Sequence, residues 1–127
     1  MIVATAFLVS FHEAWARVVL IYLLLVALFG LLLFFRRSEP TGQYFGSLVI
    51  AQGVVTIQAL LGVLLLLQGH RPGNNLHFLY GLVAFLTLPS AYLYTRGASV
   101  RGSSLILGLA CLFLFGISIR AISTGMH

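Results

Sequence analysis

The chain is poor in charge, and most of the charge it has is positive. Charged residues make up 7% of its 127 residues, against the quarter that is usual in a soluble globular domain. Lysine is absent, and all seven basic residues are arginine. The arginines lie beside apolar runs instead of in one cluster. The formal charge of +5 therefore does not indicate a nucleic-acid surface, and we expect no nucleic-acid partner.

Cysteine and several recognisable motifs are scarce or missing as well. Cys111 is the only cysteine, which excludes an intramolecular disulfide and leaves the redox compartment open. No basic segment precedes the first apolar stretch, which argues against a cleaved signal peptide, and no lipidation motif is present. The sequence offers neither a nucleophile constellation nor a phosphate-binding loop. We therefore expect the chain to have no catalytic activity of its own.

Apolar length is what the sequence has in abundance. Hydrophobic residues make up 61% of the chain, and they form four charge-free runs, each close to the roughly 20 residues that a spanning helix needs. We predict an all-α integral membrane protein, a bundle of four transmembrane helices that contacts the lipid bilayer. The expected spans are approximately residues 12–35, 44–68, 77–95 and 103–122, within a single transmembrane domain over residues 1–127.

The distribution of arginine predicts an orientation. The first and third connectors together hold four arginines, Arg36, Arg37, Arg96 and Arg101, whereas the second holds only Arg71. The positive-inside rule then places both termini outside, in a multi-pass protein of the bacterial cytoplasmic (inner) membrane.

The two halves of the chain resemble each other. Gly46-Ser47 and Gly102-Ser103 each open the second helix of a hairpin, and His12 and His77 each lie near the start of the first. Two tandem helical hairpins would produce this pattern, and so would chance similarity between apolar stretches. Small residues on the fourth run, among them Ser104, Gly108 and Cys111, predict a face for close helix packing.

Two local features of the third run carry predictions of their own. Pro89 lies inside it, so we expect a kink and a freed carbonyl that Thr87 or Ser90 satisfies. Asn74 or Asn75 precedes it as a plausible N-cap.

All four histidines map to the outer side of this topology: His12, His70, His77 and His127. Neutral imidazole is a common metal ligand and an axial ligand of haem. We predict that His12 and His77, at similar depth, can ligate one haem b iron, with hydrogen bonds to headgroups, water or Glu13 as the alternative. Gln58, near the middle of the second run, is a candidate either for an interhelical bond or for a quinone carbonyl, and Gln52 faces another direction.

Glu13 is the only acidic residue near a span, and an intramembrane carboxylate is a functional candidate. Arg17 follows at the spacing of a helical ion pair, and we expect Arg120 to join it in a structural cluster. In length, four spans and an early glutamate, the chain is similar to the small multidrug resistance family. That resemblance implies a small proton-coupled transporter that uses Glu13, although Arg17 departs from the family pattern because it is placed to neutralise the carboxylate.

The segment Met1–Phe11 is apolar length that a single span cannot use. Joined to the first run it would make a helix of roughly 52 Å, against a hydrocarbon core of about 30 Å. We therefore expect these residues to lie in the interface or against another protein. The leading prediction is a small accessory subunit of a larger bacterial membrane complex of respiratory or photosynthetic electron transport, with other membrane-protein subunits as partners. The alternatives are the haem- or quinone-binding protein and the transporter.

Overall fold

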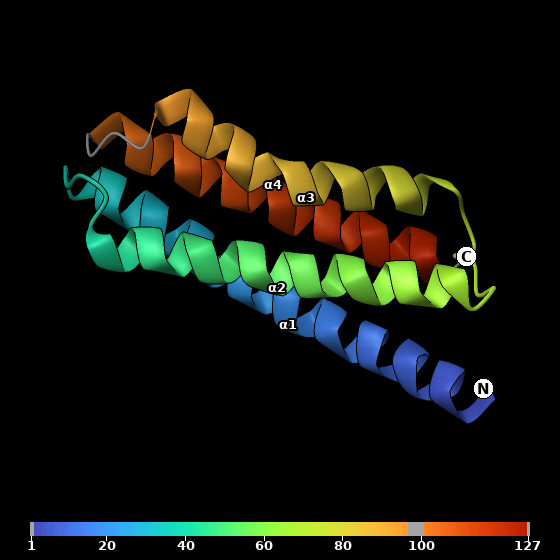
Figure 1. Ribbon diagram of the computed structural model, residues 1–127. Coiled ribbons are helices and arrows are strands. Elements are labelled where there is room, and N and C mark those ends of the chain that lie inside the picture. Colours follow the sequence, from blue (N-terminus) through green and yellow to red (C-terminus); the bar gives the residue numbers. More distant parts are fainter. Residues whose placement is uncertain (1, 97–100, 127) are drawn as a thin grey trace.

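Four long helices joined by short turns make up the computed structural model, which describes residues 2–96 and 101–126 (Figure 1). The helices are α1 (Ile2–Phe35), α2 (Gly42–Leu67), α3 (Leu76–Thr95) and α4 (Arg101–Met126), and this described part contains no strand. All four are long and apolar enough to cross a membrane. The predicted all-α bundle of four transmembrane helices is therefore confirmed. His127 lies outside the described residues.

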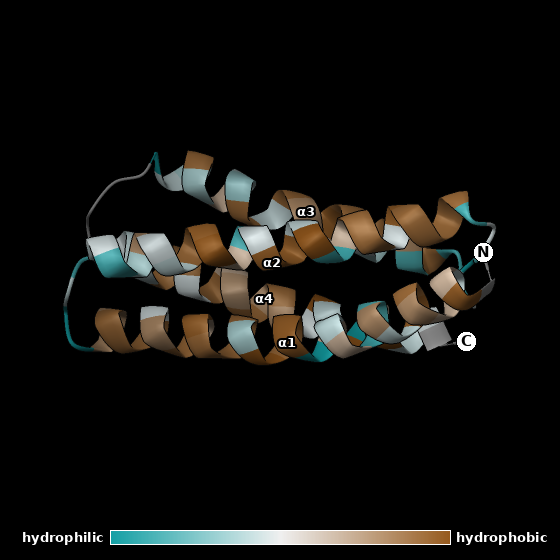
Figure 2. Cartoon of the chain, turned by 60° about the horizontal axis from the view of Figure 1, so that its bottom comes forward, coloured by the Kyte–Doolittle hydropathy of each residue, from teal (hydrophilic) through white to brown (hydrophobic). Residues whose placement is uncertain are grey.

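The segment preceding the first predicted span is helical. It continues α1 back to Ile2, so the helix has 34 residues and a length of about 51 Å. By contrast α3 has 20 residues, or about 30 Å. Apolar residues line the helices, with hydrophilic residues concentrated in the turns (Figure 2). Large apolar side chains are exposed on every helix, as on a surface that contacts lipid.

The helices form a ring in which each packs against the two next to it. Contacts join α1 to α2, α2 to α3, α3 to α4 and α4 to α1, while the diagonal pairs make no backbone contact within the described part. Neighbours are antiparallel, so α1 and α3 begin at the same end of the bundle (Figure 1). We call this the histidine end, after His12, His70 and His77; Arg36, Arg37 and Arg96 lie at the opposite end.

The closest contact is that between α1 and α4. Gly30 and Gly108 meet where the helices cross: a Cβ atom added to Gly108 would lie 3.1 Å from the backbone nitrogen of Leu31 and 3.2 Å from the carbonyl carbon of Gly30. Ser104 and Cys111, one turn to either side, have no exposed surface. The small-residue face predicted for the fourth run is therefore confirmed as the surface on which α1 packs.

The contact between α2 and α3 is the least extensive, and Gln52 bridges it. Its Nε2 donates to the carbonyl oxygen of Phe85 at 3.0 Å. That oxygen lies four residues before Pro89, which has no N–H to donate to it. The expectation that Thr87 or Ser90 satisfies this carbonyl is wrong: Thr87 donates to Val83 instead, at 2.6 Å. A side chain from the neighbouring helix supplies the missing donor.

The helix ends are closed by local hydrogen bonds. Gly69, at φ 82°, ends α2 in a Schellman motif in which the backbone N–H of His70 donates to Leu65 at 3.0 Å. Arg37 ends α1 in the same motif, at φ 58°. This left-handed conformation is strained for any residue other than glycine. At the start of α3, Asn75 occupies the N-cap position without a side-chain capping bond. The Oδ1 of Asn74 instead accepts from the backbone N–H of Leu76 at 2.9 Å.

Candidate functional site

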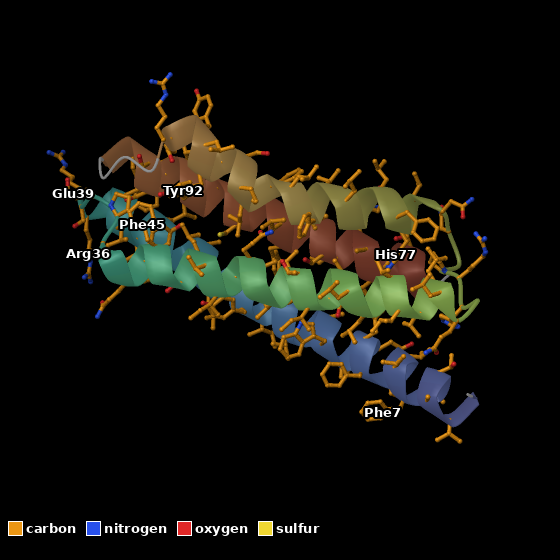
Figure 3. The ribbon with its side chains drawn as sticks, in the orientation of Figure 1. Phe7, Arg36, Glu39, Phe45, His77 and Tyr92 are labelled. Atoms are coloured by element: carbon orange, nitrogen blue, oxygen red, sulfur yellow. The ribbon has the colours of Figure 1, made fainter. Side chains whose placement is uncertain are left out.

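Two histidines meet inside the bundle at the histidine end. His12 lies three turns into α1. His77 lies in the first turn of α3 (Figure 3). Their ring centres are 6.2 Å apart, and the ring planes are inclined at 79°. Both side chains are half-buried. The structure therefore brings together, from two diagonal helices, the two histidines that the sequence singled out.

A backbone carbonyl of α4 fixes the tautomer of His77. Its Nδ1 lies 2.8 Å from the carbonyl oxygen of Ala121, and because a carbonyl only accepts, this nitrogen must carry the proton. The Oγ1 of Thr124 lies 3.4 Å from the same nitrogen. Nε2 is left as the nitrogen with a free lone pair. Metal-ligating histidines have this arrangement, in which the second ring nitrogen donates to an acceptor behind the ring.

His12 is held by Gln58 of α2 through its backbone. The Nε2 of Gln58 donates to the carbonyl oxygen of His12 at 2.9 Å. The Nδ1 of His12 and the Oε1 of Gln58 are both buried and have no hydrogen-bond partner. Gln58, predicted as an interhelical bond or a cofactor ligand, thus makes the interhelical bond and leaves its oxygen beside the histidine.

Glycines of the other two helices flank the histidine rings. A Cβ atom added to Gly62 of α2 would lie 3.6 Å from the Cε1 of His12, and one added to Gly125 of α4 would lie 3.0 Å from the Cε1 of His77. Alanine at Gly125 would crowd the His77 ring, whereas alanine at Gly62 would meet the His12 ring at ordinary van der Waals distance. Side-chain volume is therefore low on both sides of the histidine pair.

The spacing of the rings suits a metal held between them. A metal ion about 2.0 Å from one nitrogen of each ring would place the two ring centres about 6 Å apart, since a ring nitrogen lies about 1.1 Å from its centre. The observed separation is 6.2 Å. Within the described residues, no group of three or more histidine, cysteine or acidic side chains could hold a metal. Two histidines could therefore complete only an ion that brings further ligands of its own, and the same separation is also that of a direct edge-to-face contact between two rings.

The predicted ion cluster has a different arrangement. Glu13 and Arg17 are exposed on α1, and among the described residues no ion pair joins either of them to Arg120. The guanidinium of Arg120 instead lies 6.0 Å from the centre of the Tyr80 ring, a cation–π contact between α4 and α3.

Some parts of the site carried no sequence signal that pointed to them. Ala121 contributes a backbone oxygen, which its residue type does not predict. No pattern in the sequence indicates Thr124. Gly125 lies near the end of the fourth apolar run, where a glycine does not by itself indicate a site.

No protein family matches the chain, and no curated protein or solved structure matches it significantly.

Proposed function

We propose that this chain is a small membrane protein that binds haem b, with His12 and His77 as the two axial ligands. The observation that carries the proposal is the meeting of their rings, 6.2 Å apart, from two diagonal helices. The bonded Nδ1 of His77 and the flanking glycines support it. A bound haem would supply a one-electron Fe(III)/Fe(II) couple, and two imidazole ligands would leave its iron no open coordination position for a substrate.

A visible spectrum tests this directly. Protein extracted in mild detergent and reconstituted with haem should show the sharp reduced bands of a low-spin b-type cytochrome. His12→Ala and His77→Ala should each lose them, whereas His70→Ala should keep them. His70 is the matched control because it lies at the same end but is exposed in the turn after α2. A reconstituted wild-type protein without the low-spin bands would refute the proposal.

The angle between the rings adds a finer test. The two imidazole planes are inclined at 79°, and imidazoles held at that angle would leave two d orbitals of a bound iron nearly equal in energy. Ferric protein should then give the highly anisotropic low-spin EPR signal of perpendicular ligands. A rhombic signal, typical of parallel planes, would show that the rings turn when the haem binds.

We further infer that the protein lies in a bacterial cytoplasmic membrane with both termini outside. Four arginines in the first and third turns against one in the second support this orientation. The histidine pair would then lie near the outer surface. Cysteine introduced at Asn75 or at Glu39, each in Cys111→Ser protein, should react with an impermeant maleimide on intact cells only at Asn75. The reverse pattern would overturn the orientation.

A second candidate function, as an accessory subunit of a larger redox complex, draws on the start of α1. Phe7 points away from the other helices (Figure 3), and its side chain is 67% exposed. It stacks on Phe11, which stacks on Trp15, with ring centres 6.2 and 5.9 Å apart. Because α1 is about 51 Å long, part of this apolar ladder must extend past the hydrocarbon core. An apolar helix of another membrane subunit would cover it.

Copurification tests the accessory role. After mild extraction, the native protein should migrate in an assembly well above 13.8 kDa, and Phe7→Ser should release it. Phe113→Ser is the control, because Phe113 is similarly exposed but lies on α4, away from the ladder. A native chain that migrates as a monodisperse monomer would rule out this role.

A further inference from the structure

Each histidine is hydrogen-bonded by a group on the second helix of its own hairpin. Behind His77 stands the carbonyl of Ala121 on α4, the second helix of its own hairpin. At His12 the amide of Gln58, on α2 and so on the second helix of the His12 hairpin, donates to the backbone carbonyl and not to the ring. The difference is that the bond to His77 Nδ1 is formed, while His12 Nδ1 and Gln58 Oε1 each lack a partner.

Those two unpartnered atoms are complementary. A neutral histidine can donate from Nδ1, and an amide oxygen can only accept. Buried polar groups are almost always hydrogen-bonded, since burial without a partner is unfavourable. The Gln58 amide is already anchored to the backbone of His12 by its nitrogen, at 2.9 Å. Its oxygen therefore belongs to an amide that is already held against His12.

We propose that Gln58 is the positioning residue of His12: its Oε1 accepts the Nδ1 hydrogen and so presents Nε2 to the metal. The assignment rests on the proposed haem function. It makes the two ligands equivalent, each with Nδ1 bonded to an oxygen of its own hairpin and Nε2 left as the unbonded ring nitrogen. It also gives one amide two tasks, holding the α1 backbone and orienting the ring.

The bond has an electronic consequence that a purely structural amide would lack. A hydrogen bond from Nδ1 increases the basicity of the ligating nitrogen, and a more basic ligand stabilises ferric over ferrous iron. Removing the acceptor should therefore raise the midpoint potential, and replacing it with a carboxylate should lower it. Loss of such an outer partner also weakens metal binding by roughly 10- to 100-fold in other proteins.

The experiment compares four forms of the full chain reconstituted with haem b in detergent: wild type, Gln58→Leu, Gln58→Glu and Gln52→Leu. Gln52→Leu is the matched control, because Gln52 also bridges from α2 to a backbone carbonyl but bonds Phe85 of α3. Redox titration should give a higher midpoint potential for Gln58→Leu, a lower one for Gln58→Glu, and the wild-type value for Gln52→Leu. The haem affinity of Gln58→Leu should fall by roughly 10- to 100-fold.

The outcomes separate this assignment from the proposed function. A wild-type protein without a low-spin spectrum overturns the haem function itself. A wild-type spectrum together with an unchanged potential in Gln58→Leu overturns only the role of Gln58, and so does an equal shift in Gln52→Leu. If Gln58→Leu does not fold, Gln58→Glu decides, because it keeps the side-chain size and an acceptor. A potential in that variant at or above wild type overturns the assignment.

Discussion

The crossing of α1 and α4 predicts a large difference between two glycines of the same helix. In Gly108→Ala, the new Cβ would lie 3.1 Å from Leu31 N, 3.2 Å from Gly30 C and 3.4 Å from Ala27 O. All three are backbone atoms, so relief requires the whole of α1 to move. A Cβ added to Gly116, two turns along α4, meets nothing within 4 Å.

The two substitutions share one favourable term and differ in the unfavourable one. Replacing a helical glycine by alanine stabilises the helix by up to about 1 kcal/mol. Overpacking costs roughly 1–3 kcal/mol, and only Gly108→Ala incurs it. Gly108→Ala should therefore be less stable than Gly116→Ala by about 1–3 kcal/mol.

Reversible unfolding in mixed detergent micelles measures this difference. Circular dichroism follows the helices, and fluorescence follows Trp15, the only tryptophan. Trp15 suits the purpose because its Nε1 donates to the Val54 carbonyl at 2.8 Å and so reports on α1 packed against α2. Equal stability of the two variants, within about 0.5 kcal/mol, would refute the backbone-to-backbone crossing.

Three further results are expected. Cys111 has no exposed surface, so a small maleimide should leave it unmodified in folded protein and label it fully after unfolding, as mass spectrometry would show. Arg37→Gly should raise the unfolding free energy by about 1 kcal/mol, because glycine adopts φ 58° without strain. An unfolding free energy below that of the wild type would contradict this prediction. Tyr44→Phe removes a buried hydroxyl that has no partner, so stability in the same unfolding assay should be unchanged or higher by up to roughly 1 kcal/mol, not lower.

Much of the fold could be predicted because the bilayer constrains it so strongly. A charge-free apolar run near 20 residues has few fates other than a spanning helix, and short turns make neighbouring helices antiparallel. Antiparallel order alone puts His12 and His77 at one end. It does not set the rotation of each helix about its axis, which decides whether the two rings face each other or the lipid.

The features missed or misassigned depend on partners distant in sequence. The carbonyl freed by Pro89 offered two local donors, Thr87 and Ser90, yet its partner is Gln52, 33 residues away in the chain. Gly30 stood alone among leucines with no stripe around it, and its role follows from Gly108 on another helix. The Glu13–Arg17 spacing is that of a helical ion pair, but both side chains are exposed. An exposed ion pair contributes little to stability.

The tightest interface joins the first helix to the last, and this has a consequence during synthesis. Gly30 leaves the ribosome 78 residues before Gly108, which at about 5–20 residues per second is an interval of roughly 4–16 s. Throughout it, α1 sits in the bilayer without α4, and Tyr44 of α2 is the neighbour that can reach Gly30. Closure of the ring is therefore a single late event that waits for α4. A chain arrested before that point would offer its uncovered glycine face to any other helix that has a small-residue surface.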